Sequence, residues 1–117
     1  MRDLSILQNR YLRDTLAVRL GNLASNLAHI SSFAKKQTNP VAVERLLDES
    51  RFFIEWTAAE AQVEKAEELV ALQIQLSEWL HNWNQIQNNP DQLKIVTQRS
   101  SDWSERVLNI SGLLEEV

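Results

Sequence analysis

The segment Thr57–Gln87, with the sequence TAAEAQVEKAEELVALQIQLSEWLHNWNQIQ, carries a wide apolar helical pattern. Read as one helix at about 100° per residue, it places most of its apolar side chains within an arc of about 160°. These side chains are Ala66, Leu69, Leu72, Leu76, Trp79, Leu80, Trp83 and Ile86. A helix that packs on one neighbour needs an apolar stripe of only about 100°. We therefore expect this helix to contact more than one other helix, as the central helix of a bundle.

The composition around this segment favours an all-α fold. The 117 residues include only two glycines and two prolines, and 44% of them are hydrophobic. Such a chain is long enough for one domain with its own core, and it has few residues that would interrupt helices. We predict a single domain over residues 1–117, an antiparallel bundle of about four helices. Their predicted ranges are about 3–36, 40–56, 58–87 and 90–116.

The first predicted helix is apolar on two faces. One side carries Leu16, Leu20, Leu23, Leu27, Ile30 and Ala34, and the opposite side carries Leu4, Leu7, Tyr11 and Val18. One packed neighbour cannot cover two opposite faces of a helix, so we expect a second neighbour there. Gly21 lies within this helix at a cost of about 1 kcal/mol relative to alanine. It marks either a close helix crossing or a slight kink.

Two Asn-Pro pairs predict where helices begin. Asn39 and Asn89 suit the cap position, and the proline that follows each suits the first helical turn. Between these starts, Thr57 and Glu60 fit a capping box. The apolar stripe also changes direction near Thr57, so we predict a kink or tight turn there. One continuous helix through Thr57 is the alternative.

The charge balance limits the classes of partner. The net charge is −4, which argues against a sequence-independent grip on nucleic acid. The charge is uneven, because residues 1–57 carry eight Lys or Arg against six Asp or Glu, and residues 58–117 carry four against ten. The two halves can attract each other within a chain or between chains. No apolar run approaches the length of a membrane span, so we expect a cytoplasmic protein with no membrane partner.

The sequence does not support an enzyme, a cofactor or a metal site. The chain has no cysteine, which excludes thiolate chemistry. Glu78 and His81 have the Glu-x-x-His spacing of di-iron bundles, but the motif occurs once and lies opposite the apolar arc. His29 also lies outside the main stripe of its helix. An exposed histidine on a helical bundle can accept phosphate, so a phosphorelay-type domain with His29 as phosphoacceptor is the alternative function.

The leading prediction is a protein-interaction module, a homodimer or the partner of another helical protein. Phe52 and Trp56 lie one turn apart and off the apolar stripe of their helix, which is typical of an interface anchor. The predicted interface consists of Leu4, Leu7, Tyr11, Val18, Phe52 and Trp56. The alternative is that the start of the first helix, or the last helix, covers the two aromatic residues within the chain.

Four glutamates crowd the start of the central helix and repel one another. They are Glu60, Glu64, Glu67 and Glu68. Arg10 and Arg13 are candidate partners that would relieve this repulsion. The helix dipole, which stabilises acids in the first turn, is the other explanation for the glutamates.

Overall fold

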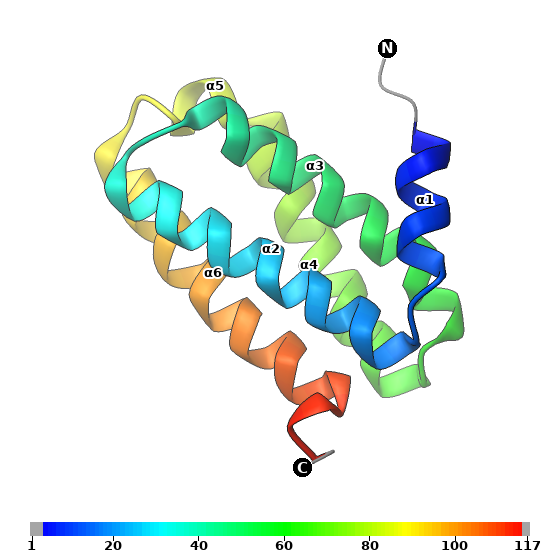
Figure 1. Ribbon diagram of the computed structural model, residues 1–117. Coiled ribbons are helices and arrows are strands. Elements are labelled where there is room, and N and C mark those ends of the chain that lie inside the picture. The colour runs from blue at the N-terminus through cyan, green and yellow to red at the C-terminus, as the bar shows by residue number, and fades with distance from the viewer. Residues whose placement is uncertain (1–3, 116–117) are drawn as a thin grey trace.

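The computed structural model describes residues 4–115, which form helices and no strand (Figure 1). The helices are α1 (Leu4–Leu12), α2 (Leu16–Lys36), α3 (Pro40–Thr57), η1 (Ala58–Glu60), α4 (Val63–His81), α5 (Trp83–Ile86), α6 (Pro90–Ser111) and η2 (Leu113–Glu115). The all-α class is confirmed. The described residues form six α-helices rather than about four, because two of the predicted helices are each divided. Residues 3 and 116, at the ends of the predicted ranges, lie outside the described residues.

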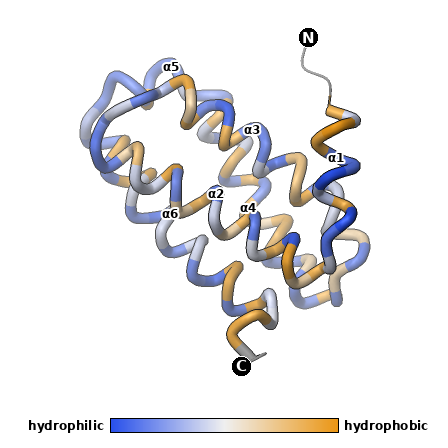
Figure 2. The backbone as a smooth tube through the Cα atoms, viewed as in Figure 1, coloured by the Kyte–Doolittle hydropathy of each residue, from blue (hydrophilic) through white to orange (hydrophobic). Residues whose placement is uncertain are grey.

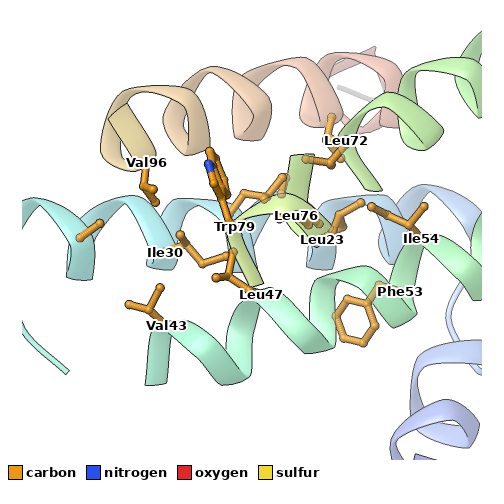
Figure 3. Packing of buried hydrophobic residues seen from close by; sticks show 14 of the residues in the cluster. Leu23, Ile30, Val43, Leu47, Phe53, Ile54, Leu72, Leu76, Trp79 and Val96 are labelled. Carbon is orange, nitrogen blue, oxygen red and sulfur yellow. The ribbon is translucent and has the colours of Figure 1, made fainter. Parts of the chain in front are cut away.

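Four long helices enclose the core. α2 and α3 run antiparallel, α4 returns behind them, and α6 lies along α2 in the opposite direction (Figure 1). The side chains of Ile30, Leu47 and Trp79, from three of these helices, lie together in the core (Figure 3). Leu69, Leu72, Leu76 and Trp79 of α4 are all buried, so the stripe predicted for this helix does face the core. The prediction that it is the central helix is wrong, because α2 packs most extensively, on both α3 and α6, whereas α4 packs mainly on α3. The short helix α1 lies at one edge of the molecule and carries hydrophobic residues of its own (Figure 2).

The predicted helix over residues 3–36 is wrong as one element, because it is interrupted at residues 13–15. Thr15 begins α2 as its N-cap, and its hydroxyl oxygen accepts a hydrogen bond from the backbone N–H of Val18 at 3.3 Å. The hydroxyl of a capping threonine replaces a backbone acceptor that a continuous helix would supply. No glycine or proline marks this break, so the chain direction changes at residues that are also compatible with a helix.

The predicted break near Thr57 is confirmed, and the continuous alternative is excluded. α3 ends at Thr57, η1 follows over Ala58–Glu60, and α4 begins at Val63 after the cap residue Gln62. The predicted capping box is wrong, because the Thr57 side chain caps no helix. It is buried and bonds with Tyr11 instead. The Thr57 hydroxyl, which the local sequence pattern predicted to cap a helix, therefore forms a hydrogen bond with a distant residue instead.

The remaining helix ends differ from prediction in smaller ways. The predicted helix 58–87 is interrupted at Asn82, which separates α4 from α5. α6 ends before Gly112, whose φ of 84° reverses the chain. Asn89 caps α6 as predicted, and its side chain accepts from the N–H groups of Asp91 and Gln92. Asn39 precedes α3 with a φ of 53° and makes no side-chain cap bond.

Small residues bring α2 and α6 close together. Ser31 Oγ donates to the carbonyl oxygen of Thr97 at 2.7 Å, and Ser104 Oγ donates to that of Ala24 at 2.8 Å. Side chains of this size let two helix backbones approach. At Gly21 a Cβ would lie 2.6 Å from Cδ1 of Leu113, a side chain of η2, so this position leaves room for η2 and does not mark a crossing of α2 and α6.

Two serines of α6 provide a matched test of this packing. The Ser100 hydroxyl is buried without a hydrogen-bond partner, whereas the Ser104 hydroxyl is bonded to Ala24. An unpaired buried hydroxyl costs about 1–3 kcal/mol, and a typical hydrogen bond contributes about 1 kcal/mol. We expect Ser100→Ala to raise the free energy of unfolding by about 1 kcal/mol and Ser104→Ala to lower it by a similar amount. Urea unfolding followed by circular dichroism measures both, and equal effects of the two substitutions would contradict this account.

Candidate interaction surface

Tyr11 is the residue that attaches α1 to the rest of the chain. Its side chain is 3% exposed and its ring stacks on that of Phe53, with centroids 4.1 Å apart and planes 11° apart. The Trp56 ring lies at a tilt on another side, 5.9 Å away between centroids. Stacked aromatic pairs contribute about 0.5–1.5 kcal/mol beyond the area they bury. Tyr11 is thus the buried aromatic contact between α1 and α3, and Leu7 of α1 also packs against the core.

The hydroxyl group of Tyr11 is satisfied inside the protein. It donates to the carbonyl oxygen of Arg19 at 3.2 Å, which leaves it to accept from the hydroxyl of Thr57, 2.7 Å away. Burial raises the pKa of Tyr11 from 10.0 to about 12, because the phenolate would lose its hydration. The hydrogen bond from Thr57 opposes this rise in pKa. The site thus favours the neutral phenol.

This pKa predicts how stability depends on alkaline pH. The folded protein holds the phenol neutral up to about pH 12, whereas the unfolded chain ionises near pH 10. The resulting stabilisation, at most about 2–3 kcal/mol, is therefore fully present below pH 10 and is lost between pH 10 and 12. Tyr11 is the only tyrosine, so the phenolate absorbance in the near ultraviolet reports this group alone. We expect no phenolate signal near pH 10 in the folded protein. Half-ionisation at pH 10 without unfolding would contradict the buried site.

Arg19 connects the end of α1 to the turn before α4. The residue is buried near the start of α2, and its Nε donates to the carbonyl oxygen of Asp14 at 2.9 Å. Nη2 points to the carbonyl oxygen of Leu12 at 3.5 Å, and Nη1 pairs with the Glu60 carboxylate. A planar guanidinium suits this role because its five N–H donors point in fixed directions. Arg19 thereby satisfies backbone oxygens at residues 12 and 14, next to the interruption.

The predicted interface residues fall into three groups. Tyr11 is covered by its own chain in this structure, and it presents no exposed side chain. Leu4, Leu7, Phe52 and Trp56 are half-buried, and the Phe52 and Trp56 rings stack with centroids 5.7 Å apart. We call these four residues the α1–α3 edge. Val18 is 39% exposed, within the first turn of α2. The alternative that the start of the first helix covers the aromatic residues thus holds in part.

An open groove separates α1 from α2. It has a volume of about 440 Å³, and its lining includes Arg10, Arg13 and Asn22, with Glu49 and Phe53 of α3. The Asn22 amide donates to the Asp14 carboxylate at 3.3 Å. α1 therefore rests on α3 along one side and leaves its side toward α2 open.

The four glutamates of η1 and the start of α4 do not pair with the predicted arginines. Glu60 pairs with Arg19, and Glu68 pairs with Arg106. Arg10 and Arg13, the predicted partners, form no ion pair within residues 4–115. Glu64 and Glu67, also in this part of the chain, likewise form none. Within residues 4–115, two positive charges on α1 and its linker and two negative charges on α4 therefore form no ion pair.

Three residues are the candidates for metal binding or phosphate transfer that the sequence offers. Glu78, His81 and His29 are all exposed, on α4 and α2. Within residues 4–115 no group of three His, Asp or Glu residues could hold a metal ion. None of the helices in this range has the length and apolar character needed to cross a membrane.

Comparison of the chain with protein-family models, with curated proteins and with solved structures finds no match.

Proposed function

We propose that this protein is a non-enzymatic, cytoplasmic α-helical interaction module that self-associates as a homodimer. Its contact surface would be the α1–α3 edge together with the charged residues at the same end of the molecule. The main observation behind this proposal is that Leu4, Leu7, Phe52 and Trp56 are only half-buried in the folded chain. Ile6 of α1, which was not among the predicted interface residues, is 62% exposed. Partly exposed apolar side chains at an edge gain burial from a partner.

Charge complementarity supports a second copy of the chain as that partner. Arg10 and Arg13 have no ion pair in the described part of the chain, nor do Glu64 and Glu67. The Arg19–Glu60 pair brings the end of α1 close to the turn that leads into α4, so both sets lie at one end of the molecule. In a two-fold dimer, the same patch of each copy faces that of the other. The arginines of each copy can then approach the glutamates of the other.

Light scattering after size-exclusion chromatography tests the proposal over a range of concentrations. We expect a dimer fraction that rises with concentration and falls in the variant Arg13→Glu, more at low salt than at high salt, because salt screens exposed charges. Lys94→Glu on α6 is the matched charge reversal, since Lys94 is exposed on another helix. A strict monomer at high concentration overturns the proposal. If Arg13→Glu and Lys94→Glu lowered the dimer fraction equally, the charged residues would not form part of the proposed contact surface.

Phosphate acceptance at His29 is the second proposal, and the exposure of its imidazole on α2 supports it. Incubation with small phospho-donors, followed by detection of acid-labile phosphohistidine, tests it. We expect any signal to vanish in His29→Ala and to persist in His81→Ala, the matched control on α4. No acid-labile phosphate on the native protein would exclude the proposal.

A further inference from the structure

We propose that α1 is an exchangeable arm: in the dimer, α1 of each copy docks on α3 of the other copy. Tyr11 of one chain then fills the site formed by Phe53, Trp56 and Thr57 of the second chain. This inference rests on the proposed self-association and specifies how the two copies would join.

The receiving site is small and independent of which chain supplies the tyrosine. Among the described residues of α1, Tyr11 alone is buried. Its contacts are the Phe53 ring at 4.1 Å, the Trp56 ring at 5.9 Å and the Thr57 hydroxyl at 2.7 Å. Phe53, Trp56 and Thr57 all lie on the last turns of α3. The Tyr11 hydroxyl has one further partner, the carbonyl oxygen of Arg19 on α2. A second copy presenting the same helix would reproduce these contacts.

The linker between α1 and α2 has two ways to satisfy its backbone. In this structure the carbonyl oxygens of Leu12 and Asp14 receive the Arg19 side chain, and the N–H of Val18 donates to Thr15 Oγ1. In a continuous helix, the same carbonyl oxygens would receive the N–H groups four residues later. Residues 13–15 are Arg, Asp and Thr, with no proline or glycine to prevent that arrangement. The Leu12 and Asp14 carbonyl oxygens can therefore be bonded in both states, to the Arg19 side chain when the linker is bent and to backbone N–H groups when it is straight.

Straightening alone is unfavourable, and a second copy changes this. An isolated open chain would expose the Phe53 ring and leave the buried Thr57 hydroxyl without its partner. In the straight form, residues 4–15 would extend about 18 Å beyond the start of α2, at about 1.5 Å per residue. There its Tyr11 can reach only another molecule. Two open chains recover the lost contacts by exchanging their arms, a common route to dimers.

Nuclear Overhauser spectroscopy on mixed samples tests the exchange. One sample of the protein carries ring-¹³C tyrosine and deuterated phenylalanine rings, and another is deuterated except for its phenylalanine rings; the two are unfolded together and refolded at equal concentrations. The short Tyr11–Phe53 distance should then give a cross-peak between differently labelled chains, and Phe53→Leu should remove it. The control places both labels on one chain diluted in unlabelled protein.

The outcomes separate the exchange from the self-association on which it rests. A dimer with the cross-peak between chains supports both proposals. A dimer whose Tyr11–Phe53 cross-peak stays within one chain overturns the exchange and leaves self-association standing. A protein that scatters light as a monomer at the concentration of the experiment overturns self-association, and the exchange with it.

Substitution of Thr15 gives a second, independent test. The φ of −64° at Thr15 suits proline in the bent linker, whereas proline within a straight helix would remove a hydrogen bond and clash with the preceding turn. We expect Thr15→Pro to raise the dimer dissociation constant by about 100-fold or more. Thr15→Ala removes only the cap of the bent form and should lower that constant. Circular dichroism verifies that both variants fold. An unchanged dissociation constant in Thr15→Pro would contradict a straightened linker.

Discussion

Replacing Leu76 with alanine is expected to lower the free energy of unfolding by about 2–5 kcal/mol, because it leaves a cavity in the core. Leu76 lies on α4 with no exposed surface, among the residues that the four long helices bury together. Part of the loss is the transfer free energy of the removed methyl groups, and the rest is the cost of the space they leave. Chemical denaturation with circular dichroism as the signal measures the change.

Ile74→Ala is the matched control, two residues away on the same helix. Its side chain is 58% exposed, so its removal should change the free energy of unfolding by well under about 1 kcal/mol. The comparison separates burial from helix propensity, because both substitutions introduce alanine into α4. If the two substitutions had similar effects, Leu76 could not be the core residue described here.

Tyr11→Ala is expected to release α1 from α3 at a cost of about 3 kcal/mol or more, as for other buried aromatic residues. The substitution removes the ring that stacks on Phe53 and the hydroxyl that bonds to Thr57. Amide hydrogen exchange should then show residues 4–12 exchanging much faster, with α2–α6 still protected. Faster exchange in the core helices to the same degree would mean that α1 is not a separate unit.

Tyr11→Phe keeps the ring and removes only the hydroxyl group. It leaves the buried Thr57 hydroxyl without a partner, so we expect a loss of about 1–3 kcal/mol with α1 still docked. Adding Thr57→Val should recover part of that loss, since valine has a similar shape and nothing to pair. No recovery in the double variant would contradict the hydrogen bond between the two residues.

The helical class and the core face of α4 were predictable because they depend on local periodicity. Leu69, Leu72 and Leu76 recur at the spacing that places them on one side of a helix, and all three are buried. The start of α6 was predictable for the same reason, because the Asn89 side chain accepts hydrogen bonds from N–H groups only two and three residues later. Signals of this kind need no knowledge of the remaining chain.

The position of α1 could not be predicted, because it depends on contacts between distant residues. The hydroxyl groups of Tyr11 and Thr57 meet across 46 positions, and Arg19 reaches Glu60 across 41. Apolar residues on the back of the first predicted helix indicated that something must cover them. The pattern did not show that a bend after Leu12 would let α1 cover the aromatic residues of α3. Thr15 was the available signal, as a capping residue in a segment otherwise read as continuous.

The serine contacts between α2 and α6 bear on how the chain is made. The bonds from Ser31 to Thr97 and from Ser104 to Ala24 join positions 66 and 80 residues apart. During synthesis on the ribosome, α2 emerges early, but its α6-facing surface stays uncovered until nearly the whole chain has been translated. Closing so long a loop is entropically costly and slows folding relative to helices that pack on their sequence neighbours. A nascent chain that stops before α6 thus exposes part of the α2 surface to chaperones and proteases.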